Sequence, residues 1–482
     1  MLNRVFKRRF VVATSLFFLA ANYLIANVYA EETKSAKRWY KCEFHSHSMW
    51  SDGRALPEVL AHTYLQEGYN FVCMTDHNVM QTPELRFSSW GYGGSCPDEK
   101  AFEGENSYWK PIVGNIWSHL GQAEVDEAIR IFGADSLKTK EIGGQTWVRL
   151  KTNEELKAQF DKPGEFLLTM GFEQTSQIPN FGHLHMNFIN VPELMPCYAE
   201  NSSLETIRKN YEEGVKKYGK PGRNWIFTVN HPMWQYYSVS PSDLIALPEI
   251  RLVELTNNST DYVLDDPNVY PFHPKGWSPE KFWDVVNAFR CSRGQRLLFA
   301  VGSSDRHFDY PKHPEMDVVG WTNVLADELT PEAILEATTH GDCYPSNGLN
   351  FKKLEFDRET KTLTVAVDAQ PGAKYRIDFI GTRRGFDETC EKVVSPAGLF
   401  PNSPERTIEV YSDDIGVVFK TVDGVEASYQ LQNDDLYVRA RAYQIDEQGA
   451  PILATPPEPE YGERWPFPKP AAWTQPFSTI SR

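Results

Sequence analysis

Two patterns of hydrophobic and polar residues divide this chain. Between residues 38 and 348, short apolar segments alternate with longer segments in which apolar residues recur at helical spacing. The apolar segments are 38–47, 70–77, 165–175, 183–191, 224–231, 250–257 and 296–305, and the helical ones are 56–69, 204–219, 279–294 and 330–341. Strands that alternate with helices favour an α/β fold with a parallel sheet, open or closed, whose faces are covered.

From about residue 349 onward, apolar and polar residues alternate with a period of two instead. The segments that fit this pattern are 351–357, 362–369, 375–381, 407–414, 427–432 and 436–446. Several short strands of this kind predict an immunoglobulin-like β-sandwich over residues 349–482. We therefore expect an α/β domain over residues 31–348, followed by a C-terminal β-sandwich domain.

A long insert, at about residues 78–164, separates the second predicted strand from the third. It is rich in loop residues and carries the aromatic residues Trp90, Tyr92, Tyr108, Trp109, Trp117 and Trp147. Loops of this length inside a compact domain commonly form lids or binding loops. The alternative is an aromatic patch that packs the insert against the rest of the domain.

The N-terminus is typical of a segment that directs export. Residues 1–10 are basic, 11–26 are apolar and 27–30 contain small residues at the expected cleavage position, which predicts a signal peptide over residues 1–30. The mature protein is then periplasmic or extracellular. A retained membrane anchor is the alternative, and "KRRFVVA" is weakly similar to a twin-arginine signal. No membrane contact is expected beyond this segment, because no other apolar run could span a bilayer.

The net charge limits the kinds of molecule that this chain could bind, and the cysteine spacing bears on disulfide bonds. The formal net charge of −16 argues against binding to a nucleic-acid backbone or to an anionic membrane, although small anionic substrates remain open. The chain has seven cysteines without CxxC spacing, which does not suggest a disulfide framework.

Histidines and carboxylates gather at the carboxyl ends of the predicted strands. His45 and His47 alternate along the first strand and so share a face, and Asp52 follows them. Later strand ends carry His77, Glu173, His183, His185, His231, Asp305 and His307. The carboxyl edge of an α/β sheet is where catalytic groups meet. Imidazole and carboxylate ligands without paired cysteines suit Zn²⁺, Mn²⁺ or Fe²⁺, so the sequence predicts a divalent-metal centre.

The ordered segments "HSH", "SDG", "TDHN", "GFE", "HLH", "NHP" and "SSDRH" resemble the PHP (polymerase and histidinol phosphatase) family over about residues 38–348. The segment "TPEAILEATTHGDCYPSNG" is similar to the last helix and loop of that family. The resemblance implies a distorted (β/α)7 barrel, two or three divalent metal ions and the hydrolysis of phosphate esters. The expected fold is therefore α/β, with this barrel followed by the β-sandwich.

The resemblance also implies a set of metal ligands. One metal ion would be held by His45, His47, Glu173 and Asp305. A second would share Glu173 and also be held by His231 and by either His183 or His185, a choice that strand alternation leaves open. The third would be held by Asp52, His77 and His307. Glu173 lies far from "TDHN" because of the insert, so its assignment rests on the strand context of "LLTMGFE".

A mechanism follows from these metal ions. A metal-bound hydroxide would attack phosphorus, and the cations would stabilise the charge that grows on the phosphate oxygens. A histidine or a metal-bound water would protonate the leaving group; His77 and His231 are the candidate histidines, although their roles as metal ligands compete with this one. Arg54 would contact the phosphate of a small-molecule ester, while Arg306 is expected to point away.

Two alternatives stay open. In the first, the same metal site hydrolyses a carboxylic or carbamate ester instead of a phosphate ester. In the second, the chain is a non-catalytic metal-containing binding protein. A contact between the sandwich domain and a glycan or protein is also left open.

Overall fold

The computed structural model describes residues 37–82, 109–112, 121–178, 182–232, 239–257, 278–307, 320–395, 406–452 and 470–479. The predicted signal peptide lies outside these residues, as do Trp90, Tyr92, Tyr108 and Trp117. Within the described ranges, no helix is long and apolar enough to cross a membrane. The six cysteines in those ranges are all free thiols.

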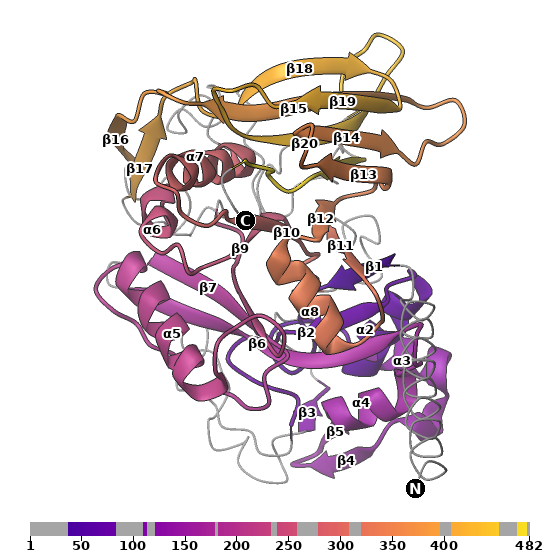
Figure 1. Ribbon diagram of the computed structural model, residues 1–482. Helices are drawn as coiled ribbons and strands as arrows, with labels where there is room; N and C mark the ends of the chain where they lie inside the picture. The colour runs from indigo at the N-terminus through magenta and orange to yellow at the C-terminus, as the bar shows by residue number, and fades with distance from the viewer. Residues whose placement is uncertain are drawn as a thin grey trace, which may run out of the picture.

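The fold is a mixed α/β structure built around one large sheet (Figure 1). Its N-terminal part contains β1 (Arg38–Glu43), β2 (Phe71–Met74), β6 (Leu167–Ile178), β7 (Gly182–Ile189), β8 (Ile226–Val229), β9 (Leu252–Thr256), β10 (Phe299–Gly302), β11 (Trp321–Ala326) and β12 (Cys343–Ser346). The helices between these strands are α2 (Pro57–Gln66), α5 (Ser203–Tyr218), α6 (Pro241–Ile245), α7 (Pro279–Ser292) and α8 (Pro331–His340). Each helical segment that the sequence predicted is therefore present.

Strand pairing is mixed, so the prediction of a parallel sheet is wrong in part. The strands follow the order β10-β9-β8-β7-β6-β2-β1-β11-β12. β1–β2, β2–β6, β8–β9 and β9–β10 are parallel, whereas β6–β7, β7–β8 and β1–β11 are antiparallel. The described strands do not close into a continuous barrel. An isolated parallel bridge between Ser46 and Arg306 nevertheless joins the chain after β1 to the chain after β10, and the distorted (β/α)7 barrel stays a prediction.

Local sequence explains where the helices begin. Ser202, Ser278 and Thr330 cap α5, α7 and α8, because each side chain accepts a hydrogen bond from a backbone N–H in the first turn. Proline occupies the first turn of α2, α7 and α8, where no N–H partner is needed. α8 ends at Gly341, whose φ of 77° is the left-handed conformation that favours glycine.

The insert contains more regular structure than its sequence predicted. Its described residues form α3 (Gln122–Phe132), a 3₁₀ turn (Ala134–Ser136), α4 (Asn153–Phe160) and a small antiparallel sheet of β3 (Trp109–Pro111), β4 (Thr139–Ile142) and β5 (Gln145–Arg149). Val125, Leu156 and Phe160 belong to a hydrophobic core shared with Leu60 and Tyr64 of α2. This part of the insert therefore packs against the α/β unit.

The described residues beyond 350 form strands without helices, and most of these strands lie toward the top of Figure 1. β13 (Phe351–Asp357), β14 (Thr362–Val367) and β19 (Glu426–Gln430) make one antiparallel sheet. β15 (Lys374–Arg383), β18 (Val417–Asp423), β20 (Asp435–Ile445) and β21 (Ala471–Trp473) extend the large sheet through β12, and β16 (Cys390–Ser395) pairs with β17 (Arg406–Tyr411). Leu363 and Val365 share a core with Ile377 and Phe379, whereas the immunoglobulin-like sandwich stays a prediction.

A buried ion-pair network joins α7 to the C-terminal strands. Arg439 of β20 donates to both carboxylate oxygens of Asp284, at 2.9 and 2.6 Å, and its Nη1 lies 2.8 Å from Glu280. Arg441 joins Glu280 at 2.9 Å to Asp378 of β15 at 3.0 Å. Because Arg439 and Asp284 are almost fully buried, this network fixes how the two parts of the chain pack.

Candidate metal centre

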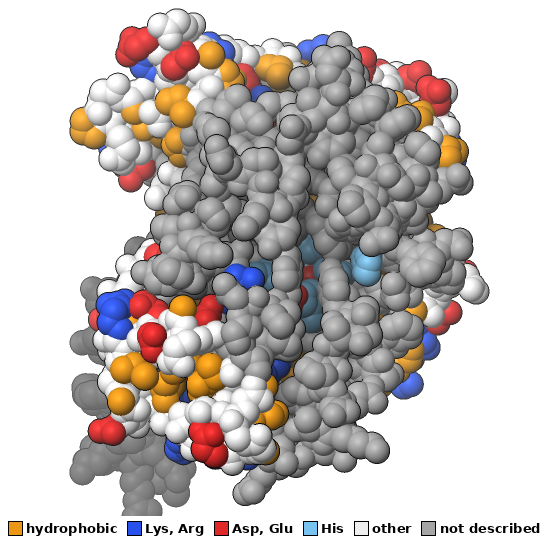
Figure 2. Space-filling model, turned by 180° about the vertical axis from the view of Figure 1, so that it is seen from behind, with side chains coloured by type: hydrophobic (Ala, Val, Ile, Leu, Met, Phe, Trp, Pro, Cys, Tyr) orange, Lys and Arg blue, Asp and Glu red, His pale blue; other side chains and the backbone are white. Residues whose placement is uncertain are grey.

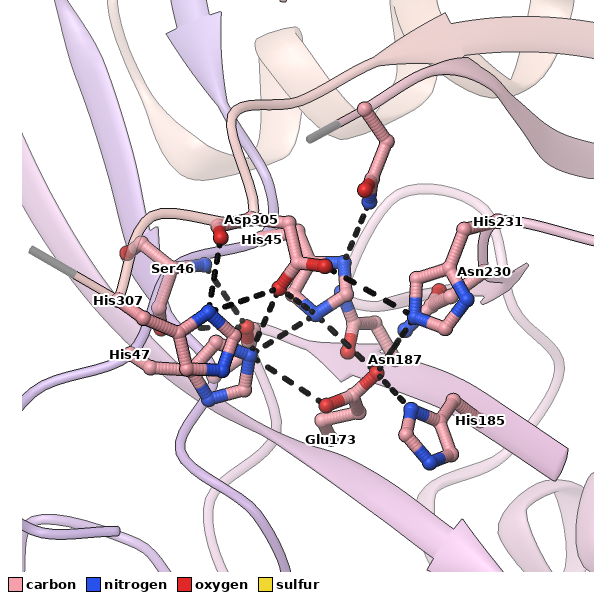
Figure 3. Close-up of polar contacts among 12 residues, drawn as sticks. His45, Ser46, His47, Glu173, His185, Asn187, Asn230, His231, Asp305 and His307 are labelled. Carbon is pink, nitrogen blue, oxygen red and sulfur yellow. Dashed lines mark hydrogen bonds and ion pairs between the residues drawn. The ribbon is translucent and has the colours of Figure 1, made fainter. Parts of the chain in front are cut away.

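The predicted metal-ligand residues other than His183 come together in one cluster, most of them just beyond the carboxyl ends of strands. The prediction of a strand's carboxyl end is wrong for His185, which lies near the amino end of β7 because this strand runs antiparallel to β6, and Glu173 lies within β6. Figure 3 shows His45, His47, Glu173, His185, His231, Asp305 and His307. His45 and His47 follow β1, His77 follows β2, His231 follows β8, and Asp305 follows β10. Together with Asp52, Glu173, His185 and His307, these residues form four overlapping groups whose ligand atoms lie within 4.8 Å of one another. Histidine side chains are also visible at the face that Figure 2 shows.

Glu173 lies at the centre of this cluster. Its Oε1 is 3.1 Å from His45 Nε2 and 3.1 Å from His185 Nδ1, while its Oε2 is 2.7 Å from His77 Nδ1. Asn230 donates to Oε1 at 2.8 Å, which orients the carboxylate. The insert does not displace Glu173, because β6 pairs with β2 and an isolated bridge joins Glu173 to His77.

Asp305 joins the histidine pair from the opposite side. Its Oδ1 lies 3.2 Å from His45 Nε2 and 3.1 Å from His47 Nε2, and the two Nε2 atoms are 3.1 Å apart. His231 Nε2 is 3.9 Å from Asp305 Oδ2 and 3.7 Å from Glu173 Oε1. His231 and Asp305 have φ values of 20° and 48°, a conformation that costs free energy and often marks functional residues.

A third group of ligand atoms lies nearer the solvent. Asp52 Oδ2 is 3.4 Å from both His77 Nε2 and His307 Nε2, and its Oδ1 is 3.6 Å from His47 Nδ1. The side chains of Asp52 and His307 are 32% and 40% exposed, whereas those of His45, His47 and Glu173 are fully buried. This group therefore forms the side of the cluster from which a substrate could approach.

The loop that carries Asp52 is held by Asp76. This buried carboxylate accepts hydrogen bonds from the backbone N–H and hydroxyl of Ser48 and of Ser51, at 2.8 to 3.1 Å. Gly53 lets the loop turn back, because a Cβ there would lie 2.3 Å from the carbonyl oxygen of His47. Asp76 thus positions the loop and is absent from the metal-ligand groups of the described residues.

Glu254 of β9 contacts the cluster, although the sequence did not single it out. Its Oε1 lies 2.8 Å from His45 Nδ1, and its Oε2 accepts from the backbone N–H of His231 at 3.0 Å and from Asn257 at 2.7 Å. A carboxylate on one nitrogen of an imidazole fixes the tautomer and directs the other nitrogen's lone pair toward a metal. Glu254 therefore orients His45 toward the centre of the cluster.

The electrostatics of the cluster fit a bound cation. In neutral His45, Nδ1 donates to Glu254, so Nε2 carries a lone pair. This lone pair faces three other electron-rich atoms, namely His47 Nε2, Glu173 Oε1 and Asp305 Oδ1. So many electron donors at about 3 Å, in a buried site, require positive charge between them. The residues present therefore fit divalent metal ions.

The protonation states point the same way. Burial together with His307 and His77 lowers the pKa of His47 to about 3, and burial lowers the pKa of His185 to about 4. Burial would raise the pKa of Glu173, yet His45, His77 and His185 outweigh it and hold that pKa well below its usual range. Burial would also lower the pKa of His45 and His77, yet Asp305 and Asp52 outweigh it and raise both well above the usual range. A cation bound between the carboxylates and the imidazoles would take the place of these protons.

His183, Arg54 and Arg306 lie outside the groups of candidate ligand atoms. His183 is half-buried, and its register opposite Gln177 sets it farther along β7 from Glu173 than His185, which lies opposite Thr175. Arg54 is half-buried beside the cluster and donates its backbone N–H to the carbonyl oxygen of His307 at 2.7 Å. Arg306 is buried and donates to Glu67 at 3.0 Å, so it points away, as expected.

Comparisons with known proteins gave matches among solved structures. Neither the protein-family models nor the curated protein sequences matched the chain. One similar structure is a two-domain protein from Bacteroides vulgatus, described as containing a predicted PHP-like metal-dependent phosphoesterase. It is 14% identical, with 85% of this chain and 95% of that chain covered and a TM-score of 0.35.

Another similar structure is a histidinol phosphate phosphatase from Lactococcus lactis, in complex with zinc, L-histidinol and phosphate. It is 15% identical, with 56% of this chain and 86% of that chain covered and a TM-score of 0.23. The chain is thus similar, at low identity, to solved structures of the PHP type.

Proposed function

We propose that this chain is an exported, metal-dependent phosphoesterase of the PHP type. The observation that carries the proposal is the position of Glu173, whose two buried oxygens lie within 4 Å of histidines from four different segments of the chain. A carboxylate in this position can bridge two cations. Export is inferred from the signal-like residues 1–30 alone.

The proposed ligands are the nine residues that the geometry brings together. His45, His47, Asp305 and Glu173 would hold one divalent ion, and Glu173, His185 and His231 would hold a second. Asp52, His77 and His307 would hold a third at the exposed side. Two neighbouring cations supply Lewis-acid charge and an activated water, which is the chemistry that phosphate ester hydrolysis needs.

The other residues bind and orient the substrate. Arg54, beside the exposed group, would bind a non-bridging phosphate oxygen through its guanidinium. His77 is 12% exposed whereas His231 is 3% exposed, so His77 lies nearer to a leaving oxygen that points toward solvent. His77 could deliver a proton only in a protein molecule in which it does not hold the third ion, since its two ring nitrogens face Glu173 and Asp52. Burial of the remaining ligands keeps bulk water out of the cluster.

A substrate comparison tests this proposal. The metal-loaded protein should hydrolyse a phosphomonoester or phosphodiester of p-nitrophenol, and an Arg54→Ala variant should lose turnover of the phosphate ester with its metal content unchanged. Exclusive turnover of p-nitrophenyl acetate or an aryl carbamate would instead support the carboxylic or carbamate ester alternative. Turnover of none of these esters by fully loaded protein would favour the binding-protein alternative.

A further inference from the structure

A cavity lies at the opposite end of the strands from the metal cluster. Its volume is about 640 Å³, within the size range of small-molecule sites. Ile226 and Phe227 at the start of β8, Leu252 at the start of β9 and Arg296, which precedes β10, line this cavity. His231, Asn257 and Asp305 follow the same three strands at their other ends, so the cavity and the metal cluster are separate places in the fold.

The cavity has an apolar floor. Ile226, Phe227 and Leu252 are almost fully buried, and the half-buried ring of Tyr211 meets the ring of Phe227 edge-on with centroids 5.5 Å apart. A flat apolar group of a ligand would therefore contact aliphatic and aromatic carbon at the base of the cavity.

Its rim is basic. Four cationic side chains line the cavity, against the two carboxylates of Glu249 and Asp342; the cations are Lys220, Arg251, Arg296 and Arg358. Lys37 further offsets one carboxylate, since its Nζ lies 3.4 Å from Asp342. The chain as a whole has a net charge of −16, whereas the side chains that line this cavity carry more positive than negative charge.

Three of these cations have no carboxylate partner in the described part of the chain. Lys220 follows α5, Arg296 precedes β10 and Arg358 lies in the turn between β13 and β14, so segments distant in sequence bring them to one cavity. All three side chains are exposed, and none forms an ion pair with any described residue. Unneutralised cations that converge on a concave surface lower the free energy of a bound anion.

We propose that this cavity binds a small organic anion with an apolar, preferably aromatic, body. The carboxylate, sulfonate or phosphate group of such a ligand would lie among Lys220, Arg296 and Arg358, and its ring would lie on Phe227 and Leu252. This binding needs no metal ion and does not depend on hydrolysis by the metal cluster.

Calorimetric titration of the metal-loaded protein with naphthalene-2-sulfonate tests the proposal. We expect saturable binding that weakens at least about tenfold in an Arg296→Glu/Arg358→Glu double variant, because two attractive charges become repulsive. Arg293→Glu is the matched control, since Arg293 is exposed, lies three residues from Arg296 and does not line the cavity. The control should bind as the natural protein does, and thermal unfolding should show that both variants are folded.

The neutral analogue 2-naphthol should bind at least about tenfold more weakly than the sulfonate. Equal affinity of the sulfonate for the natural protein and the double variant would overturn the proposal, because the anion would then bind elsewhere, including at the metal cluster. Absence of saturable sulfonate binding, or equal affinity for the neutral analogue, would overturn it as well. Each of these results is read without any assay of ester hydrolysis.

Discussion

Replacing Glu254 by glutamine tests how the metal cluster is oriented. Glu254 makes three hydrogen bonds, to His45 Nδ1 at 2.8 Å, to the backbone N–H of His231 at 3.0 Å and to Asn257 at 2.7 Å. All three partners are donors. Glutamine preserves the volume but supplies only one acceptor oxygen, so its NH₂ group must face at least one of them.

The magnitude follows from these contacts. Exchange of a charge-assisted bond for a mismatched neutral group in a buried site costs about 2 kcal/mol, which corresponds to about 30-fold in metal affinity. This value lies within the 10- to 100-fold that is typical for a group that orients a metal-bound histidine.

Competition with a chromogenic chelator measures the affinity. Glu58→Gln is a matched control, because Glu58 is equally buried but lies in α2, with Lys151 at 3.7 Å. The control should bind metal as the natural protein does. Affinity of Glu254→Gln within twofold of the natural protein, with the fold intact, would refute the role given to Glu254.

Three further predictions concern stability. Asp284→Ala removes the two hydrogen bonds that buried Arg439 makes to this carboxylate and leaves it only Glu280, so it should lower the free energy of unfolding by about 3–5 kcal/mol in urea titrations. Asp423→Ala, which breaks an exposed pair with Arg376, should cost under about 1 kcal/mol. Burial would raise the pKa of Glu280, but Arg441 and Arg439 outweigh it and lower that pKa from 4.5 to about 2. The stabilisation from Glu280 is therefore present above pH 4.5 and lost as the pH falls through 2, so unfolding of Glu280→Gln should depend less on pH in this window; equal dependence would contradict the assignment. Removal of metal with EDTA should lower the unfolding temperature, and Zn²⁺ or Mn²⁺ should restore it; an unchanged temperature would contradict a metal bound to the folded state.

Most of the candidate ligand residues could be predicted because they occupy recognisable local positions along the chain. His45 and His47 share a face by strand alternation, and His77, His231 and Asp305 stand two or three residues after the end of an apolar strand. Glu173 was predictable despite the insert for the same reason, since its place depends on its own strand and on pairing with β2.

Glu254 could not be predicted from local pattern. It alternates with apolar residues in "LVELT", as a solvent-facing acid in any half-buried strand would. Only the pairing of β9 with β8 and β10 brings the Glu254 carboxylate to Nδ1 of His45. Strand alternation could not decide between His183 and His185 either, because it places both on the same face of β7. The register of β7 against β6 decides which of them lies beside Glu173.

Two errors had a signal in the sequence. β6 ends at Ile178 and β7 begins at Gly182, and so short a connection excludes a parallel crossover, which needs a dozen or more residues. In the insert, Thr152 and Glu155 form a capping box that marks the start of α4. The loop-rich composition around it concealed this helix.

Metal content tests the central claim most directly. Natural protein and a Glu173→Ala variant, purified alike and exposed to Zn²⁺ or Mn²⁺, would be compared by elemental analysis. We expect two or three divalent ions per natural chain, and loss of at least two binding positions together in the variant, because Glu173 faces the ligands of all three groups. Equal metal content in the two folded proteins, or no bound metal in the natural protein, would contradict the account.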